Sequence, residues 1–361
     1  MDTSVDPLLA TPPLTTLAEE AGSGASKRLR QAAREALAGR SSAKGGPGVI
    51  VKDVFLLLHW VGWYVLCLHV GQAHAALPVL LAVPMALCIV AIMFGVMHDG
   101  SHRSISERGF WNRLGSSTLI LAGASAISWR QEHVVRHHGR TNILDQDPDL
   151  ETGGWLRYHP AQPRRPIHRY QHRYATLLYC LVALRWIWFE DFDDLLRNRY
   201  GLAPGARLLH AVEILVAKTC HVLLFLVVPA LFWDLGSVFA FYLVHMAVVG
   251  LVMSLTFVLA HVGGEQAMYE DGTALPDEWT RSQLASTANF AVHNRALSWF
   301  VGGLNFQIEH HLFPGTSPKH YPKLLPVVKR WAEEEGLPYH EFPTVRAALS
   351  AHFRHLAALG R

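Results

Sequence analysis

The sequence has few cysteines, and their positions do not suggest a redox or zinc site. There are four cysteines in 361 residues, and no two of them form a C-x-x-C pair. We therefore expect free thiols, without a disulfide framework or a cysteine-ligated zinc. The formal net charge is only +3 and no concentrated basic run is present, so a nucleic-acid-binding protein is not expected.

A secretory leader is not predicted either. Residues 1–26 carry four acidic side chains and lack the basic start and apolar core of a signal peptide. Proline, serine, threonine, alanine and glycine dominate residues 1–48, so we expect a mostly disordered arm with at most a short helix over 27–37. Residues 49–345 are expected to form one membrane domain, and residues 346–361 a C-terminal helical tail.

Long apolar stretches indicate a membrane protein. Half of the residues are apolar, and four stretches approach the roughly 20 residues that a helix needs to cross a bilayer, at 54–70, 75–96, 212–233 and 238–260. The short links within the two pairs hold no Lys or Arg, whereas the arm, the middle segment and the C-terminal part are basic. The positive-inside rule then places both links outside and all larger polar segments in the cytoplasm.

The fold class follows from this pattern. We predict an all-α integral membrane protein with four transmembrane helices in two hairpins and a histidine-rich cap on the cytoplasmic face. The segments 111–128 and 174–189 are apolar but short or amphipathic. We expect them to be interfacial helices that lie in the membrane plane, because counting either as a span would put some histidines on the wrong side.

Histidines cluster at the cytoplasmic edges of these stretches. Two boxes are His98-Asp-Gly-Ser-His102, after the second stretch, and His133-Val-Val-Arg-His137-His138. On an α-helix, residues i and i+4 share a face, so two imidazoles can reach one metal, while a residue at i+5 is turned toward a second. The predicted metal ligands are His98, His102, His133, His137, His138, His261, His310 and His311.

The spacing of one box is weak evidence alone. With 22 histidines in the chain, about one H-x-x-x-H pair is expected by chance. The pair His168 and His172 has the same spacing but lies away from any predicted span end, so we interpret it as a chance match. Imidazole nitrogens without cysteine suit zinc, copper, iron or nickel. Seven or eight convergent histidines exceed the four ligands of one structural zinc, which indicates two metals.

The third box carries a family resemblance. The run 300–314, which contains Gln307-Ile-Glu-His310-His311, resembles the last histidine box of membrane fatty acid desaturases. It is most similar to the front-end and linoleoyl-CoA-type branch, in which Gln opens this box. The segments 137–149 and 168–174 are also similar to that branch, and the resemblance covers about 94–343.

The resemblance implies dioxygen-dependent desaturation of a fatty acyl chain, carried by coenzyme A or a lipid, at two irons held by the eight histidines. Gln307 stands where other branches have a histidine ligand. Gln307, Asp99 and Glu309 are expected to act through water or by orienting a ligand. Since no His-Pro-Gly-Gly haem motif is present, the electrons are expected from an external ferredoxin or b-type cytochrome with its reductase.

The sequence contains further candidate motifs and is compatible with other functions. Trp129, Trp155, Phe300 and Phe306 are candidates to line an acyl tunnel. The acidic run 145–151 lacks the Gly and Glu of a calcium loop, so we interpret it as a solvated loop. The alternatives are a di-iron hydroxylase or ketolase, a histidine-rich metal transporter or sensor, and a non-catalytic scaffold. The Gln-Ile-Glu-His-His run favours the desaturase, and a transporter would need ligands along the membrane interior.

Overall fold

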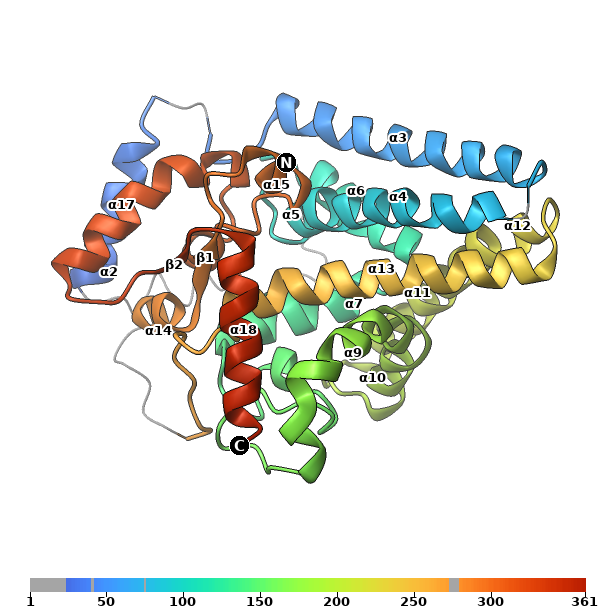
Figure 1. Ribbon diagram of the computed structural model, residues 1–361. Helices are drawn as coiled ribbons and strands as arrows, with labels where there is room; N and C mark the ends of the chain where they lie inside the picture. The colour runs from blue at the N-terminus through green and yellow to red at the C-terminus, as the bar shows by residue number, and fades with distance from the viewer. Residues whose placement is uncertain (1–23, 40–41, 75, 273–278) are drawn as a thin grey trace.

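The computed structural model describes residues 24–39, 42–74, 76–272 and 279–361. Within them, four helical runs are long and apolar enough to cross a membrane. They are α3 (Pro47–Gly71); α4 (Ala76–Ile92) with η2 (Met93–Met97) and α5 (His98–Ser101); α11 (Pro204–Val222) with η8 (Leu223–Val227) and α12 (Val228–Ala230); and α13 (Leu235–His261). The two hairpin links lie at one end of the molecule (Figure 1). The predicted all-α membrane fold with four spans is confirmed.

The first, third and fourth spans begin earlier than the predicted apolar stretches because helix start signals lie before those stretches. Pro47 and Pro204 stand in the first turns of α3 and α11, where the missing proline N–H needs no partner. Asp234 caps α13, since its carboxylate accepts a hydrogen bond from the backbone N–H of Ser237 at 3.0 Å. These signals determine the residues at which α3, α11 and α13 begin.

The helix α13 lies at the centre of the bundle and packs against α4 and α9. Its approach to α9 (Gln171–Arg185) depends on Gly250, where a Cβ atom would lie 2.6 Å from the backbone oxygen of Tyr179. On the outer side of the bundle, Leu58 is 66% exposed and Leu80 is 68% exposed. Such apolar faces are suited to lipid.

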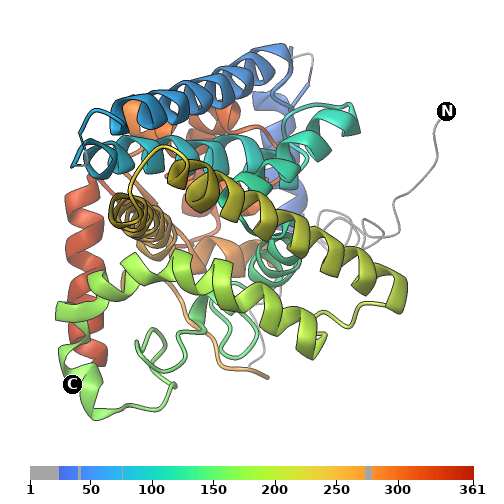
Figure 2. The ribbon, with the colours of Figure 1, turned by 90° about the vertical axis from the view of Figure 1, so that its right-hand side faces the viewer.

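The helix α9 crosses the bundle instead of extending it. Figure 2 views the molecule from the hairpin end, and it shows α13 close to end-on with α9 running across it. After α9 come η7 (Trp186–Glu190) and α10 (Asp191–Arg197). Leu177 and Leu181 of α9 point outward and are 65% and 47% exposed. The segment predicted over 174–189 is therefore helical, and in the described residues it is not one of the four candidate spans.

Short elements between the hairpins carry the second histidine box. They are α6 (Gly109–Ser117), η3 (Thr118–Ala122), α7 (Ala126–Trp129), η4 (Arg130–His137), α8 (His138–Arg140), η5 (Pro148–Leu150) and η6 (Pro166–Tyr170). The element η4 is a π-helix, in which the backbone N–H of His138 bonds to the carbonyl of His133. This wide turn changes which histidines of the box lie close to one another.

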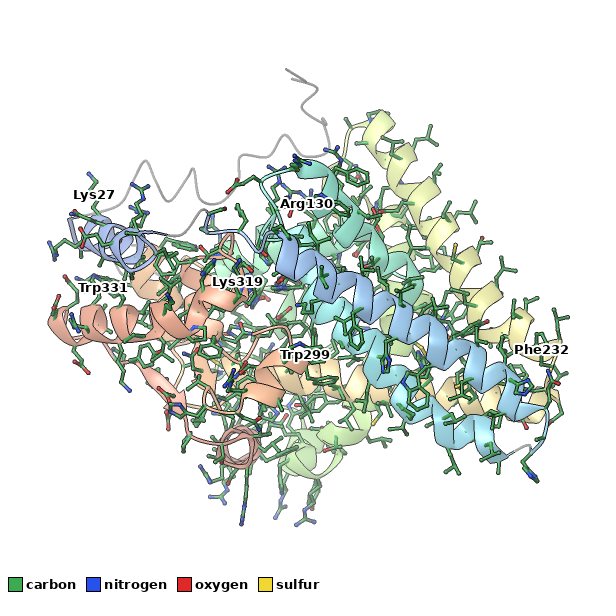
Figure 3. All side chains as sticks on the ribbon, turned by 90° about the horizontal axis from the view of Figure 1, so that it is seen from above. Lys27, Arg130, Phe232, Trp299, Lys319 and Trp331 are labelled. Carbon is green, nitrogen blue, oxygen red and sulfur yellow. The ribbon has the colours of Figure 1, made fainter. Side chains whose placement is uncertain are left out.

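A cap covers the end of the bundle opposite the hairpin links. It contains α14 (Trp279–Ser286), β1 (Ala288–Phe290), α15 (Arg295–Phe300), α16 (Gln307–Leu312), η9 (Pro318–His320), α17 (Tyr321–Glu334), β2 (His340–Phe342) and α18 (Val345–Leu359). The strands β1 and β2 form a short parallel pair. Figure 3 shows Lys27 and Trp331 at this end and Phe232 at the other.

Part of the expected disordered arm is ordered. Gly24–Ala36 form the helix α2, which packs against α17 and buries Ala25, Leu29 and Ala33. These three residues recur every fourth position, so they form one apolar stripe on a helix that also carries three arginines and a lysine. The short helix expected over 27–37 is thus present, and it begins at Gly24. Residues 1–23 lie outside the described part.

Candidate metal centre

The histidines of the first box project from the end of the second span. His98 begins α5, which continues the π-helical η2, and His102 follows the last residue of that short helix. His261 is the last residue of α13. Both spans end at the cap, so these three imidazoles reach the same end of the bundle. His310 and His311 come from α16, whose six residues are all buried.

All eight predicted ligands lie in one cluster of imidazoles. The ring centres of His98 and His310 are 4.6 Å apart, and those of His138 and His311 are 4.3 Å apart. Three groups have ring nitrogens close enough to share an ion: His98, His102, His133 and His310; His137, His261 and His311; and His138, His310 and His311. His310 and His311 each belong to two groups, which matches a centre with two neighbouring metals.

Most of the ring nitrogens that face the cluster have no partner among the described residues. Six Nε2 atoms are buried without a hydrogen bond to any described residue; they belong to His102, His137, His138, His261, His310 and His311. A buried polar atom without a partner costs about 1–3 kcal/mol. The Nε2 atoms of His98 and His133 lie 3.1 Å apart, close to the spacing of two nitrogens that bind one metal at about 2.1 Å. The residues present therefore fit a pair of metals.

The opposite ring nitrogens of several ligands, their Nδ1 atoms, are held by the protein. The Nδ1 atom of His137 bonds to the carboxylate of Asp147 at 3.0 Å, and that of His311 bonds to Oε1 of Gln283 at 2.7 Å. The Nδ1 atom of His261 bonds to the backbone oxygen of Ser286 at 3.2 Å. An acceptor at Nδ1 fixes the tautomer and leaves the lone pair of Nε2 facing the cluster.

The wide turn of η4 distributes the second box over the cluster. His133 belongs to the group with His98 and His102, whereas His137 belongs to the group with His261. His98 and His102 lie in one group, as expected for residues i and i+4 on an α-helix, whereas His133 and His137 lie in two different groups. The reason is that i→i+5 hydrogen bonding changes the rotation per residue, so α-helical geometry does not apply there.

Burial keeps most of the imidazoles neutral. Desolvation, and then the neighbouring imidazoles, lower the pKa well below its ordinary value for His102, His133, His138, His310 and His311. His137 differs: although burial opposes protonation, the carboxylates of Asp149 and Asp147 raise its pKa to about 9. Neutral imidazole is the form that binds metals, so these five histidines present free lone pairs at neutral pH, whereas His137 must release a proton when it binds a metal.

Comparisons with known proteins identify the family. The family model described as fatty acid desaturase matches residues 73–343. The chain is 33% identical over 326 residues to an acyl-lipid (8-3)-desaturase of Physcomitrium patens, covering 87% of this chain and 67% of that one. It is 33% identical over 283 residues to an sn-1 linoleoyl-lipid 6-desaturase of Synechocystis sp., covering 77% and 79%.

This chain belongs to the fatty acid desaturase family. Members of the family are oxidoreductases, so the chain is an enzyme, and its four apolar helices make it a membrane protein. A further relative is the Delta(5) fatty acid desaturase A of Dictyostelium discoideum, 29% identical over 318 residues, with 84% of this chain and 68% of that one covered. The resemblance seen in the third histidine box is confirmed.

The structure of the desaturase also places the three polar residues beside the ligands. Gln307 is buried at the start of α16, and its Nε2 has no hydrogen-bond partner among the described residues. One carboxylate oxygen of Asp99 lies 3.9 Å from Nδ1 of His98. Glu309 faces away from the imidazoles: it accepts hydrogen bonds from Asn289 and Tyr339, each at 2.8 Å. Burial raises the pKa of Glu309 to about 7.

The interpretation of the acidic run 145–151 as a solvated loop holds for Asp145, Asp149 and Glu151, which are exposed, but is wrong for Asp147. The Asp147 side chain has no exposed surface, and it accepts hydrogen bonds from His137 and from the backbone N–H of Asn142. Its position ten residues after a box histidine was a usable signal. Gln283, by contrast, is missed because no spacing or neighbour in the sequence connects it with His311.

Other predicted residues separate into those near the cluster and those away from it. Trp129 stacks on His133, with ring centres 4.5 Å apart and an angle of 21°. Trp155 is 59% exposed on the surface of the desaturase and does not line an interior tunnel. His168 bonds to the backbone oxygen of Gly154 at 3.0 Å and to the N–H of Arg165, so the structure gives it a role in loop packing.

Proposed function

We propose that this desaturase introduces a double bond into a fatty acyl chain in a dioxygen-dependent reaction at two histidine-ligated irons. One –CH2–CH2– unit, one O2, two electrons and two protons give –CH=CH– and two water molecules. Bound iron would supply the oxidising power with which dioxygen removes hydrogen from an unactivated methylene. The side chains of this protein cannot supply that chemistry as acids or bases.

One observation carries the proposal. Eight buried imidazoles, from the second span, the middle segment, the fourth span and α16, gather in one cluster, and the Nε2 atoms of six of them have no partner among the described residues. We assign iron binding to His98, His102, His133, His137, His138, His261, His310 and His311. An all-nitrogen ligand set also suits other metals, and the choice of iron rests on the family.

The remaining residues of the site hold the imidazoles and exclude water. Asp147 orients His137 and Tyr321 contacts His310, with 3.3 Å between its hydroxyl and Nδ1. Trp129 and Phe257 cover one side of His133, with ring centres at 4.5 and 5.9 Å. We propose that the acyl chain passes along this aromatic wall. Gln307 is proposed to reach the metals only through water.

The substrate and the electron donor follow from the relatives. Two relatives are named for acyl-lipid and linoleoyl-lipid substrates, which supports a membrane lipid as the acyl carrier here. We propose that electrons arrive one at a time from a ferredoxin or a b-type cytochrome with its reductase. Both carriers are one-electron proteins that approach from the aqueous side.

We propose that the imidazole cluster lies on the cytoplasmic face. The links at 71–75 and 234–236 carry no Lys or Arg, whereas the cap and the segments beside the span ends are basic. The second and fourth spans both end at the cluster, at His98–Ser101 and His261. Two hairpins whose links lie outside the cell account for the charge distribution and for the position of the span ends. The exposed leucines of α9 support its placement at the interface.

Expression in a host that makes no polyunsaturated lipids tests the function. Gas chromatography of the host's fatty acids should reveal a new alkene that depends on dioxygen and disappears in His310→Ala. Metal analysis of the purified protein should give two irons per chain. A hydroxylated or keto product without an alkene would instead show the sister hydroxylase or ketolase, and zinc alone after anaerobic iron loading would favour a transporter or sensor.

A further inference from the structure

One face of α14 contacts three of the proposed ligands. Trp279 donates its indole N–H to the backbone oxygen of His138 at 3.0 Å. Gln283 binds His311, and the backbone oxygen of Ser286 accepts from His261. Positions 279, 283 and 286 follow the i, i+4, i+7 repeat, so they share one side of the helix. The ligands that they contact come from α8, α16 and α13, which are far apart in sequence.

Gln283 makes the most specific of these contacts. Its side chain is 2% exposed, and its Oε1 lies 2.7 Å from Nδ1 of His311. The hydroxyl of Thr141 lies 3.0 Å from the same Oε1 and 2.7 Å from the backbone oxygen of His137. An amide oxygen accepts from the N–H at Nδ1, so the Nε2 of His311, which has no partner among the described residues, points its lone pair into the cluster.

We propose that Gln283 is a positioning residue that orients His311 with a neutral acceptor, so that His311 donates less strongly to its metal than the carboxylate-backed His137. This inference rests on the proposed di-metal function and adds a role to a residue outside the histidine boxes. His137 and His311 share one group, together with His261. Within that group, one imidazole is therefore backed by a carboxylate, one by an amide and one by a backbone carbonyl.

A carboxylate and an amide at Nδ1 differ in how strongly they make the opposite ring nitrogen donate to a metal. A carboxylate at Nδ1 draws the proton toward itself and makes the opposite nitrogen a stronger donor, whereas an amide fixes the ring without that increase. A stronger donor stabilises the more oxidised metal. Replacing the amide by a carboxylate at position 283 should thus keep the orientation of His311 and lower the reduction potential of the metal that it binds.

A purely structural role for Gln283 predicts different metal affinities for its variants. If Gln283 only filled space, a leucine of similar volume would leave the metal affinity unchanged, and a glutamate would behave no differently. Ser282 offers a matched control. It is buried on the same helix, and its hydroxyl bonds only to the backbone oxygen of Trp279 among the described residues, so Ser282→Ala leaves the ligand contacts intact.

The test titrates metal-free wild type, Gln283→Leu, Gln283→Glu and Ser282→Ala anaerobically with Fe²⁺ and follows the heat of binding. We expect Gln283→Leu to bind one of two irons 10–100-fold more weakly, while Ser282→Ala binds as wild type. Gln283→Glu should regain the affinity and titrate at a lower potential in a spectroelectrochemical cell. The unfolding temperature of each metal-free variant shows whether the fold itself has changed.

The outcomes separate this inference from the proposed function. Wild type that binds two irons and forms an alkene, together with Gln283→Leu of unchanged affinity, would overturn the role of Gln283 alone. So would Gln283→Glu with the potential of wild type. Wild type that binds no pair of irons would overturn the proposed function instead, because the inference presupposes it. Should Gln283→Leu unfold early without metal, the Gln283→Glu potential decides.

Discussion

The Nδ1 atom of His137 lies 3.0 Å from one carboxylate oxygen of Asp147, and neither side chain is exposed. The second oxygen accepts from the backbone N–H of Asn142 at 2.7 Å. We expect Asp147→Asn to lower iron affinity and alkene formation 10–100-fold, because an amide removes the charge and one acceptor. Asp145→Asn, in the same loop on an exposed residue, should have no effect. Equal losses in both variants would contradict the role of Asp147.

His138 connects the two halves of the cluster. Both of its ring nitrogens are buried without a partner among the described residues, and its ring lies 4.6 Å from that of His310. We expect His138→Ala to lose at least about 100-fold in alkene formation and to retain fewer than two irons per chain. The measurements are product analysis and metal content.

The matched variant is His172→Ala, which removes the second histidine of the chance H-x-x-x-H pair. It should retain both irons and its activity, since His172 belongs to none of the imidazole groups in the described structure. An inactive, iron-deficient His172→Ala protein that still folds would mean that this pair takes part in the centre.

Gly302 holds the third box against the second span. It has a φ of +59°, and a Cβ atom there would lie 2.4 Å from the backbone oxygen of Phe94, four residues before His98. Gly302→Ala should therefore destabilise the protein by at least about 2 kcal/mol and separate His310 from His98. Thermal unfolding in detergent and iron content measure both effects. Gly48→Ala, where nothing lies within 4 Å, is the control.

His352 predicts a pH dependence of stability away from the metal centre. It is fully buried between Tyr179, at 2.7 Å from Nε2, and the backbone oxygen of Val262, at 2.7 Å from Nδ1. Burial lowers its pKa to about 4. Because the unfolded chain takes up the proton at higher pH, this contribution is complete above about pH 6.5 and is lost as the pH falls toward 4.

Between pH 7 and pH 5 the loss should be about 2 kcal/mol. It should appear as a lower unfolding temperature and as faster proteolysis near α18. His352→Gln can donate to Val262 and accept from Tyr179 but does not titrate, so its stability should vary less over that range. A pH dependence identical to wild type would rule out His352 as the cause.

The sequence was sufficient for the features that depend on periodicity and spacing. The apolar lengths predicted four spans, and the positions of the boxes placed His98 and His261 at span ends. The first residues of the spans were predicted less accurately, since Pro47 and Pro204 begin their helices before the apolar stretches that start at residues 54 and 212. The apolar stripe of α2 is difficult to predict because only three small or apolar residues form it. The composition of the segment around it is typical of disorder.

The details of the site depend on geometry that the sequence does not display. The division of the second box between two groups follows from the π-helical turn at 130–137, which has no residue signature. Asp147 lies in a run that looks solvent-exposed, and only the fold buries it against His137. Gln283 contacts His311 over 28 positions of sequence, so no local pattern could connect them.

The membership of the imidazole groups has a consequence for biogenesis. Each of the three all-histidine groups includes His310 or His311, which come from α16 near the end of the cap. All four spans precede that helix in the chain, so a ribosome finishes them before any of these groups can close. In the proposed di-iron enzyme, iron loading would then be a late step, and an incomplete chain already in the bilayer would hold no assembled centre that could react with dioxygen.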